Sequence, residues 1–394
     1  MMRRGLPFEY AVRNLGRRRL RTALTGVATA LVAAVLVATA AFVRGLEQSF
    51  ASAARPDTAI LLSAVSERDV LRSTVAQSVP ELVAADVPGV RIIGGRPAIS
   101  GEIHMGTNVR LGAEAGDATK DQPVPGFVRG ITDGAFLVHD AVTIVGGRPP
   151  GSSEVLVGRL AAEKMGVAPE ALAIGKQIRF EGGVFTVSGV FAAPGTTIES
   201  EIWTNVHELK GLVKRDDVSV VFVRMEKPEL LSRLELFCKR RLDLELISIP
   251  SALYYKELAA YFAPIRGLAW VMAAMIAVAA MFSGANTLNA AIQDRLRELA
   301  ALGTIGYSLG ALVRSLFLEA IILASGGGLI GLVLARLFVS GSAVRIAMSA
   351  FALDVDAVAI LAGFAGVLTL GILGTIPAGL RVARLPIAQA LKEP

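Results

Sequence analysis

The chain has 394 residues, of which 53% are hydrophobic, and a formal net charge of +6. That hydrophobic share is too high for one soluble domain, and the excess collects in four apolar runs, whereas residues 51–264 have the composition of a soluble domain. No basic face with interleaved aromatic residues supports nucleic-acid binding, and the single cysteine, Cys238, excludes an intrachain disulfide.

Residues 1–21 are predicted to form a cytoplasmic amphipathic helix. A basic cluster beside a span marks the cytoplasmic end of that span. Seven arginines, opposed by Glu9 alone, precede the first apolar run: Arg3, Arg4, Arg13, Arg17, Arg18, Arg19 and Arg21. Residues 22–43 then carry no charge and would extend roughly 33 Å as a helix, enough to cross the hydrocarbon core. A cleaved signal peptide is the alternative, since Ala38-Thr39-Ala40 offers a cleavage site, but the length of the run favours a retained anchor.

Residues 44–265 contain no spanning run and are predicted to form an extracytoplasmic α+β domain. Gly182-Gly183 indicates a hairpin between two of its strands. Strands are expected at 58–65, 90–93, 154–157, 177–180, 184–191, 202–204, 218–225 and 244–249, and helices after Ser78, at 159–165 and at 229–241. The first and last parts of this domain each have the order strand–helix–strand, and the middle consists mostly of short strands. We therefore expect a βαβ lobe with a β-rich lobe, about 127–210, inserted into it.

Three further spans are predicted, at 266–293, 315–336 and 357–380. Aromatic residues before the first of these indicate a membrane-interface belt: Tyr254, Tyr255, Tyr261 and Phe262. Glu319 is expected near the cytoplasmic end of its span, at the interface or paired with Arg314. Four spans place both termini, and the basic tail 381–394, on the cytoplasmic side of the plasma membrane, with a loop at 337–356 outside.

The segment 294–314 between the second and third predicted spans is expected to be cytoplasmic and to contain a short amphipathic helix, 294–302. Leu299 and Leu302 lie on its apolar stripe, while Arg295, Arg297 and Glu298 fall elsewhere on the wheel. We expect the stripe to dock in a groove on a soluble partner, with the charged residues at the rim. The alternative is that these leucines bury only against the neighbouring spans.

Small residues recur in the last two spans. Gly327 and Gly331 form a small-xxx-small pair in the third, and the fourth has a similar character with Gly363, Gly366, Gly371 and Gly374. Such residues let helices approach closely. They could pack within one subunit or between two, and the sequence leaves both open.

The motifs of several chemistries are missing. The chain has no G-x-x-x-x-G-K-[ST] phosphate loop, and no serine or cysteine stands beside a base in a recognised context. His104, His139 and His207 have no partner at ligand spacing, so no metal site is indicated, and Cys238 is interpreted as a small core residue. We therefore expect no enzyme activity and no cofactor bound by this chain.

Three motifs occur in a fixed order along the chain. They are Ala11–Leu15 with Arg17-Arg18, Leu20–Thr22 and Leu24-Thr25; Arg297–Leu299 with Leu302, Gly306 and Phe317–Ala320; and Ala383-Arg384 with Pro386 and Ala390–Lys392. Together with one span, a large outer domain and three more spans, they resemble the entry helix, coupling helix and C-terminal signature of the FtsX/MacB-like permeases of ABC transporters, the group that includes the lipoprotein-releasing and DevC-like permeases. One departure is Gly303, where the family usually has a basic residue.

The resemblance implies porter-like and Sabre-like lobes and a permease subunit that transmits the motion of a separate cytoplasmic ATPase to its outer domain. ATP and Mg would then bind that ATPase. A second permease copy, identical or related, membrane lipid and a periplasmic adaptor protein are the further candidate partners. The residues that match the coupling motif are Arg297, Glu298, Leu299, Leu302 and Gly306. An FtsX-like regulator of a cell-wall hydrolase is the alternative, and a secondary carrier is a third class, disfavoured because neither repeats nor broken helices are visible.

Overall fold

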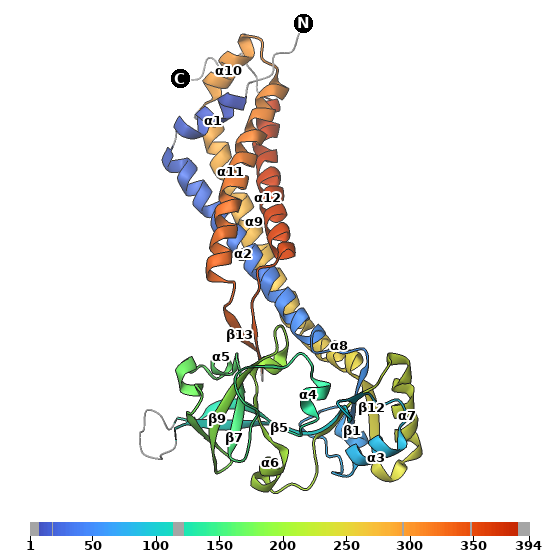
Figure 1. Cartoon of the computed structure of the whole chain (residues 1–394). Coiled ribbons are helices and arrows are strands. Elements are labelled where there is room, and N and C mark those ends of the chain that lie inside the picture. Colours follow the sequence, from blue (N-terminus) through green and yellow to red (C-terminus); the bar gives the residue numbers. More distant parts are fainter. Residues whose placement is uncertain (1–7, 18, 113–121, 294, 347–348, 385–394) are drawn as a thin grey trace. The chain divides into compact units, whose positions relative to one another are not determined.

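The computed structural model describes residues 8–17, 19–112, 122–293, 295–346 and 349–384. The chain divides into two compact units (Figure 1). The helical unit comprises residues up to Arg44, Pro264–Ser342 and the residues from Leu353, and the outer unit comprises Gly45–Ala263 and Ala343–Ala352. Short 3-10 helices connect parts of the outer unit: η1 (Ala64–Ser66), η2 (Pro169–Leu172), η3 (Thr197–Ser200), η4 (Pro228–Leu230) and η5 (Leu242–Leu244).

The first lobe of the outer unit is built from two split βαβ units. Its strands β1 (Thr58–Ser63), β4 (Ile99–Leu111), β11 (Val220–Arg224) and β12 (Leu246–Pro250) pair antiparallel in the order β12-β1-β11-β4. Helix α3 (Val79–Asp86) connects β1 to β4, and α7 (Leu231–Arg240) connects β11 to β12. Each strand pair that flanks a helix is therefore parallel and separated by one other strand, as in ferredoxin-like folds.

One predicted strand of this lobe was misplaced. The partner of β1 across α3 is β4, not the segment 90–93, where Val90 makes a single bridge with Met225. The strands β2 (Ile92–Ile93) and β3 (Arg96–Pro97) form a small separate hairpin. Gly94 and Gly95 turn the chain there with φ of 58° and 77°, so the chain reverses before a full strand can form.

The second lobe is inserted between β4 and β11. It contains β5 (Val124–Ile131), β6 (Thr143–Gly147), β7 (Glu154–Gly158), β8 (Gln177–Phe180), β9 (Gly183–Ala192) and β10 (Ile202–Asn205), with helices α4 (Ala135–Val138), α5 (Ala161–Met165) and α6 (Val206–Val213). Pairing runs β4-β5-β10-β7-β9, and β8 pairs with both β9 and β4, so these six strands close into a ring. The β8–β9 hairpin confirms the turn predicted at Gly182-Gly183.

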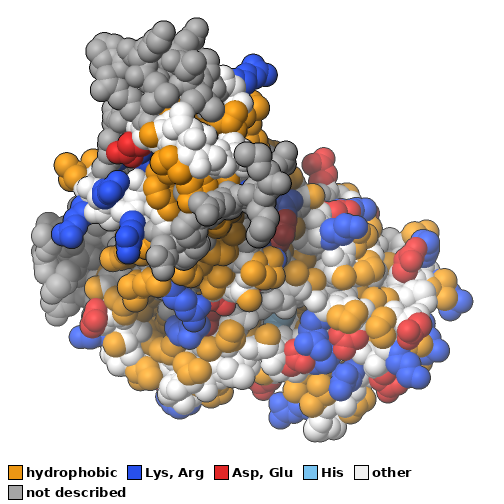
Figure 2. Space-filling view, turned by 90° about the horizontal axis from the view of Figure 1, so that it is seen from above, with side chains coloured by type: hydrophobic (Ala, Val, Ile, Leu, Met, Phe, Trp, Pro, Cys, Tyr) orange, Lys and Arg blue, Asp and Glu red, His pale blue; other side chains and the backbone are white. Residues whose placement is uncertain are grey.

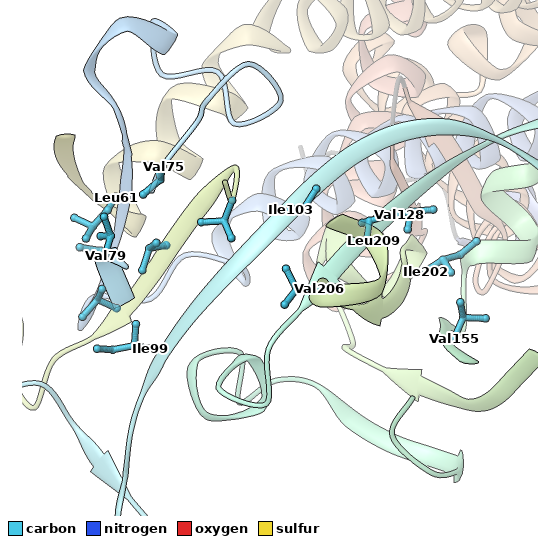
Figure 3. Packing of buried hydrophobic residues seen from close by; sticks show 14 of the residues in the cluster. Leu61, Val75, Val79, Ile99, Ile103, Val128, Val155, Ile202, Val206 and Leu209 are labelled. Atoms are coloured by element: carbon cyan, nitrogen blue, oxygen red, sulfur yellow. The ribbon is translucent and has the colours of Figure 1, made fainter. Parts of the chain in front are cut away.

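Strand β4 joins the two lobes, because its first residues pair with β11 and its later residues with β5 and β8. One continuous apolar cluster follows it (Figure 3). Leu61 and Val79 pack at its first-lobe end, Val128 and Leu209 pack at its second-lobe end, and Ile103 of β4 lies between them. The sequence analysis missed β4, β5 and β6, and it missed α6 although Asn205 caps that helix by accepting from the His207 N–H.

The helical unit contains α1 (Phe8–Arg17), α2 (Arg19–Ala51), α9 (Ala263–Gln293), α10 (Leu296–Thr304), α11 (Leu309–Phe338) and α12 (Ala357–Ala383). Among the described residues, α2, α9, α11 and α12 are long and apolar enough to cross a membrane. Each is longer than its predicted span: α9 begins at Ala263 instead of residue 266, and the other three continue into segments that contain an arginine. Helix α2 belongs to the helical unit up to Arg44 and to the outer unit from Gly45.

Glycines bring the spanning helices into close contact within this one chain. A Cβ added at Gly331 of α11 would lie 2.5 Å from the Ala33 Cβ of α2 and nearer still to the Ala30 carbonyl oxygen. Gly327 faces Thr29 of α2 in the same way, and Gly363 of α12 faces Val37. The small residues of the last two spans therefore serve packing inside the subunit, one of the two alternatives that the sequence left open.

The loop predicted at 337–356 contains a pair of antiparallel strands. Strands β13 (Ala343–Ile346) and β14 (Ser349–Ala352) pair antiparallel and belong to the outer unit. The Ala350 N–H donates to Ser200 Oγ at 3.1 Å, and Ala350 and Phe351 are fully buried. The Phe351 ring would lie 3.1 Å from a Cβ at Gly45, so the hairpin packs closely on the end of α2.

Candidate functional site

Helix α10, the predicted coupling helix, is held by apolar contacts within the helical unit. Leu299 is 5% exposed and packs in a cluster with Ile292 of α9, Leu316 of α11 and Val382 of α12, and Leu302 is half-buried against the same cluster. The stripe is thus not free at Leu299, and for this leucine the alternative of burial against the neighbouring spans holds. The helical periodicity identified the apolar face correctly, but it could not show that α9, α11 and α12 bury that face.

Ionic contacts hold the start of the same helix. Arg295, predicted at a rim, is buried, and its Nη2 lies 3.4 Å from Glu319 Oε2 on α11. Asn14 Nδ2 of α1 donates to Glu319 Oε1 at 2.5 Å. The predicted pairing of Glu319 with Arg314 is wrong, since Arg314 Nε donates to the Gly310 carbonyl oxygen instead. A carboxylate facing into the bundle needs a buried cation, and Arg295 supplies it.

Two of the predicted coupling residues around α10 are exposed, and one exposed residue was not predicted. Glu298 is exposed, as is Gly306, whose φ of 104° turns the chain out of the helix. Ile305, which the sequence analysis missed, is 68% exposed and directly follows the helix. The side chain of Arg297 lies outside the described residues. Ile305 is more accessible than Leu299 or Leu302, the apolar residues that were predicted to face a partner. The one sign of it in the sequence is an apolar side chain between Thr304 and Gly306.

The predicted orientation residues lie on α1 and the start of α2. Arg13, Arg17 and Arg19 are exposed, and Arg21 is half-buried. Arg21 lines a cavity of about 380 Å³ between the spanning helices, together with Asn14, Arg295 and Glu319. Arg18 and the C-terminal motif residues Pro386 and Ala390–Lys392 lie outside the described residues. The basic residues and the buried ionic contacts thus belong to the same end of the helical unit.

The outer unit buries a second ionic network, which the sequence analysis did not foresee. Arg129 of β5 donates to Glu102 at 3.0 Å and to Glu201 at 2.6 Å, and Trp203 Nε1 also donates to Glu201 at 2.8 Å. His104 and His139 lie 3.1 and 2.9 Å from the Glu102 carboxylate, so two histidines interpreted as scattered meet at one acid. Strand alternation on β4 places Glu102 and His104 on one face, which was the available signal.

Charges in this network set its protonation. Burial alone would raise the pKa of Glu102, but His139 and Arg129 outweigh it and hold the pKa well below its usual range. Burial, followed by Arg129, lowers the pKa of His104, so that ring is neutral at pH 7. The Glu102 carboxyl is therefore ionised at neutral pH. Among the described residues, no three His, Cys, Asp or Glu side chains are placed to hold a metal ion.

Two further reactive side chains are buried in the outer unit. Cys238 of α7 is a core residue, as predicted, and burial raises the pKa of its thiol to about 11. Lys164 of α5 is 7% exposed, and burial lowers the pKa of its amine to about 8. Its Nζ lies 5.3 Å from the Phe127 ring centroid and has no hydrogen-bond partner in the described part of the chain. Of the two, the amine is the group whose charge changes near neutral pH.

Two of the four aromatic residues predicted as a membrane-interface belt are buried in the outer unit instead, whereas Tyr261 is 77% exposed. All four lie on or just after α8 (Ser251–Tyr261). Tyr255 and Phe262 are buried, and the Phe262 ring stacks on Phe50 with centroids 5.4 Å apart. They line a cavity of about 290 Å³ within the outer unit. Over the visible surface of that unit, basic and acidic side chains are interspersed, so this face offers no extended basic surface for nucleic acid (Figure 2).

Comparison with known proteins places both units. The model of the MacB-like periplasmic core domain matches residues 22–235, and the model of the FtsX-like permease C-terminal matches residues 270–387. None of the curated proteins compared with the chain matches it.

Two solved structures are similar to the outer part of the chain. The extracellular domain of the noncanonic ABC-type transporter YknZ from Gram-positive bacteria is 17% identical, covers 49% of this chain and 99% of its own, and has a TM-score of 0.37. The periplasmic region of MacB from Actinobacillus actinomycetemcomitans is 11% identical, covers 51% of this chain and 92% of its own, and has a TM-score of 0.37. On the two family models, which together cover both units, the chain belongs to the MacB/FtsX-like family of ABC transporter permeases.

Proposed function

We propose that this chain transmits ATP-driven motion from a separate cytoplasmic ATPase to its outer unit, which exports or extracts a substrate outside the membrane. Two permease copies would join two ATPase subunits in the plasma membrane, with the arginine-rich termini in the cytoplasm. ATP and Mg would bind the ATPase, and this chain would hold no cofactor and hydrolyse nothing. A periplasmic adaptor is a further candidate partner. Family membership supports the permease role, and the packing of α10 supports the mechanism.

The observation that carries the proposal is the way α10 is fixed to the spans. Leu299 joins α9, α11 and α12 in one apolar cluster, and the Arg295–Glu319 ion pair ties the start of α10 to α11. Close-packed cores resist deformation and transmit strain. A displacement of the exposed end of α10 would therefore move the spans with it instead of bending a flexible loop.

The same geometry supports an assignment of the contact with the ATPase. Leu299 is covered, so the apolar anchor that we assign is Ile305, with Glu298 at the edge of the contact. Burying an isoleucine side chain at an interface stabilises a complex by roughly 1.5–3 kcal/mol. Its loss would weaken ATPase binding about 10- to 150-fold. Leu302, half-buried, would contribute its remaining exposed edge.

The test compares two neighbouring exposed positions. Ile305→Asp should leave the membrane level and the thermal unfolding midpoint of the chain unchanged, while the ATPase no longer co-purifies and ATP no longer moves spin labels on the outer unit. Thr304→Asp adds the same charge without removing an apolar anchor and should have a much smaller effect. Leu299→Asp should instead lower the amount of folded chain.

Full ATPase binding and full ATP-driven motion in Ile305→Asp would show that this helix end is not the coupling contact. Hydrolysis of ATP by the purified chain alone would contradict the assignment of hydrolysis to a partner. Co-purification of a cell-wall hydrolase in place of an adaptor would favour the alternative function, a membrane regulator.

A further inference from the structure

The cavity of about 290 Å³ in the outer unit has mainly aromatic walls. It is bounded by α8, by the end of α2 and by strands β4, β5 and β11. Its volume lies near the lower limit for small-molecule sites. Six of the rings in its lining are those of Phe50, Phe127, Phe222, Tyr254, Tyr255 and Phe262.

The charged groups in the lining carry an excess of negative charge. Asp69 and Glu201 line the cavity with a single cation, Arg129, whose guanidinium is already bonded to Glu201 and Glu102. Glu102 lies directly behind the lining and is fully buried. Lys164, whose Nζ lies over the Phe127 ring, and Arg129 offset Glu102 and Glu201, which leaves Asp69. Asp69 Oδ2 lies 3.5 Å from Arg72 Nε, but the Arg72 side chain is 79% exposed, so solvent screens that pair and the acid remains the uncompensated charge of the lining.

The lining also presents unused polar groups. Tyr255 is 7% exposed, and within the described part of the chain neither its hydroxyl nor that of Tyr254 has a hydrogen-bond partner. Burial raises the pKa of Tyr254 to about 12 and that of Tyr255 further, so both hydroxyls stay protonated. Both residues line the cavity, so each hydroxyl can donate to an occupant.

The rings of this region already hold cations. Lys164 Nζ lies 5.3 Å from the Phe127 centroid, and the Arg129 guanidinium carbon lies 5.6 Å from the Trp203 ring and 6.0 Å from that of Phe222. Ring faces attract ammonium groups electrostatically, and an excess of carboxylate adds to that attraction. An anion would be repelled by both the ring faces and the carboxylates.

We propose that this cavity binds an organic ammonium cation carried on an apolar body. The ammonium group would lie between the tyrosine rings and the Asp69 and Glu201 carboxylates, and the apolar body would pack against Phe50 and Phe262. Phe50 belongs to α2 and Phe262 directly precedes α9, so the occupant would contact both segments that lead into the first two spans. An effect of this binding on the motion of the spans would rest on the proposed function, whereas the binding itself is independent of it.

The test uses three probes with one apolar body: 4-phenylbutylamine, 4-phenylbutanol and 4-phenylbutanoate. Binding to the full chain in lipid nanodiscs is measured by isothermal titration calorimetry, with empty nanodiscs subtracted to remove membrane partitioning. The amine should bind about 3- to 30-fold more tightly than the alcohol, from the cation–π attraction, and the carboxylate should bind least.

Two variants locate the site, and one serves as a control. Tyr254→Leu removes a ring and a hydroxyl, and Asp69→Asn removes a charge but keeps the carbonyl oxygen that caps the Leu71 N–H. Each should weaken amine binding about 3- to 10-fold with little change for the alcohol. Leu253→Ala, on the same helix but outside the cavity, should change nothing. All three should keep the thermal unfolding midpoint of the native chain.

Equal affinities for the three probes would show simple apolar partitioning and overturn the proposal. So would tightest binding of the carboxylate, which would make Arg129 the determinant, or unchanged amine binding in both variants. None of these measurements involves the ATPase. A failed binding test would therefore leave the coupling proposal standing, and a failed coupling test would leave this one standing.

Discussion

Gly331 offers the sharpest test of how the helical unit is packed. In Gly331→Ala the new Cβ would lie 2.5 Å from the Ala33 Cβ and closer to the Ala30 carbonyl oxygen, which is backbone of α2 and cannot rotate away. Helices α2 and α11 would have to separate, and overpacking of this kind costs about 1–3 kcal/mol. Replacing glycine by alanine inside a helix also favours the helix by about 1 kcal/mol, which partly offsets that cost.

A matched glycine in the same helix removes the second effect. Gly326 has open space around it, with nothing within 4 Å of an added Cβ. Because Gly326→Ala gains the same helix propensity without a clash, the difference between the two variants measures the close contact alone. Gly327→Ala, which meets Thr29 Cβ at 2.7 Å, should fall between them because part of its clash is with a side chain.

The assay is the thermal unfolding midpoint of the purified chain in one detergent, together with its membrane level. We expect Gly326→Ala to equal or exceed the native midpoint and Gly331→Ala to lie several degrees below it. If Gly331→Ala were as stable as Gly326→Ala, the contact between α2 and α11 would be wrong, and these glycines would be free to serve an interface between subunits.

The other predictions concern buried charges. Glu319→Ala leaves Arg295 buried without an acid and should destabilise the chain by about 3–5 kcal/mol. The double variant Glu319→Leu with Arg295→Leu should recover much of that loss, because neither charge is then buried alone. Additive effects of the two substitutions on the unfolding midpoint would contradict the ion pair. The pKa of Lys164 is lowered to about 8, so between pH 8 and the ordinary lysine value the unfolded chain binds more protons than the folded one. The native chain should therefore gain stability relative to Lys164→Met as pH rises through that range, by up to about 1.4 kcal/mol per pH unit, and a constant difference in midpoint from pH 7.5 to 10 would contradict this.

The sequence was sufficient to predict the elements that are determined by their own residues. The four spans and the β8–β9 hairpin could be predicted because a long apolar run and a glycine pair are local properties. Strand β4 was missed because its residues pair with β11, β5 and β8, which lie far away in the sequence. The strand at 90–93 was predicted wrongly for a related reason. An apolar run next to a turn resembles a strand, but the run itself does not show whether a partner strand lies beside it.

The candidate site was predicted less well than the fold, because burial depends on which surfaces meet. The wheel of α10 separated Leu299 from Arg295 correctly, but it could not show that α11 and α12 cover the leucine and that Glu319 draws the arginine inward. The network around Arg129 gathers residues separated by up to about a hundred positions, from Glu102 to Glu201. Long-range pairs of this kind leave no periodic signal.

The β13–β14 hairpin makes the order of synthesis matter. Ala350 and Phe351 fill a face of the outer unit formed by Gly45, α5 and η3, yet they are translated after α11, long after the rest of that unit. A nascent outer unit would therefore expose this apolar face until the third span has been made and the hairpin has emerged beside it. A soluble fragment ending at Ala263 would keep that face open permanently. Appending residues 343–352 through a short linker should therefore give a fragment that aggregates less than the continuous segment alone.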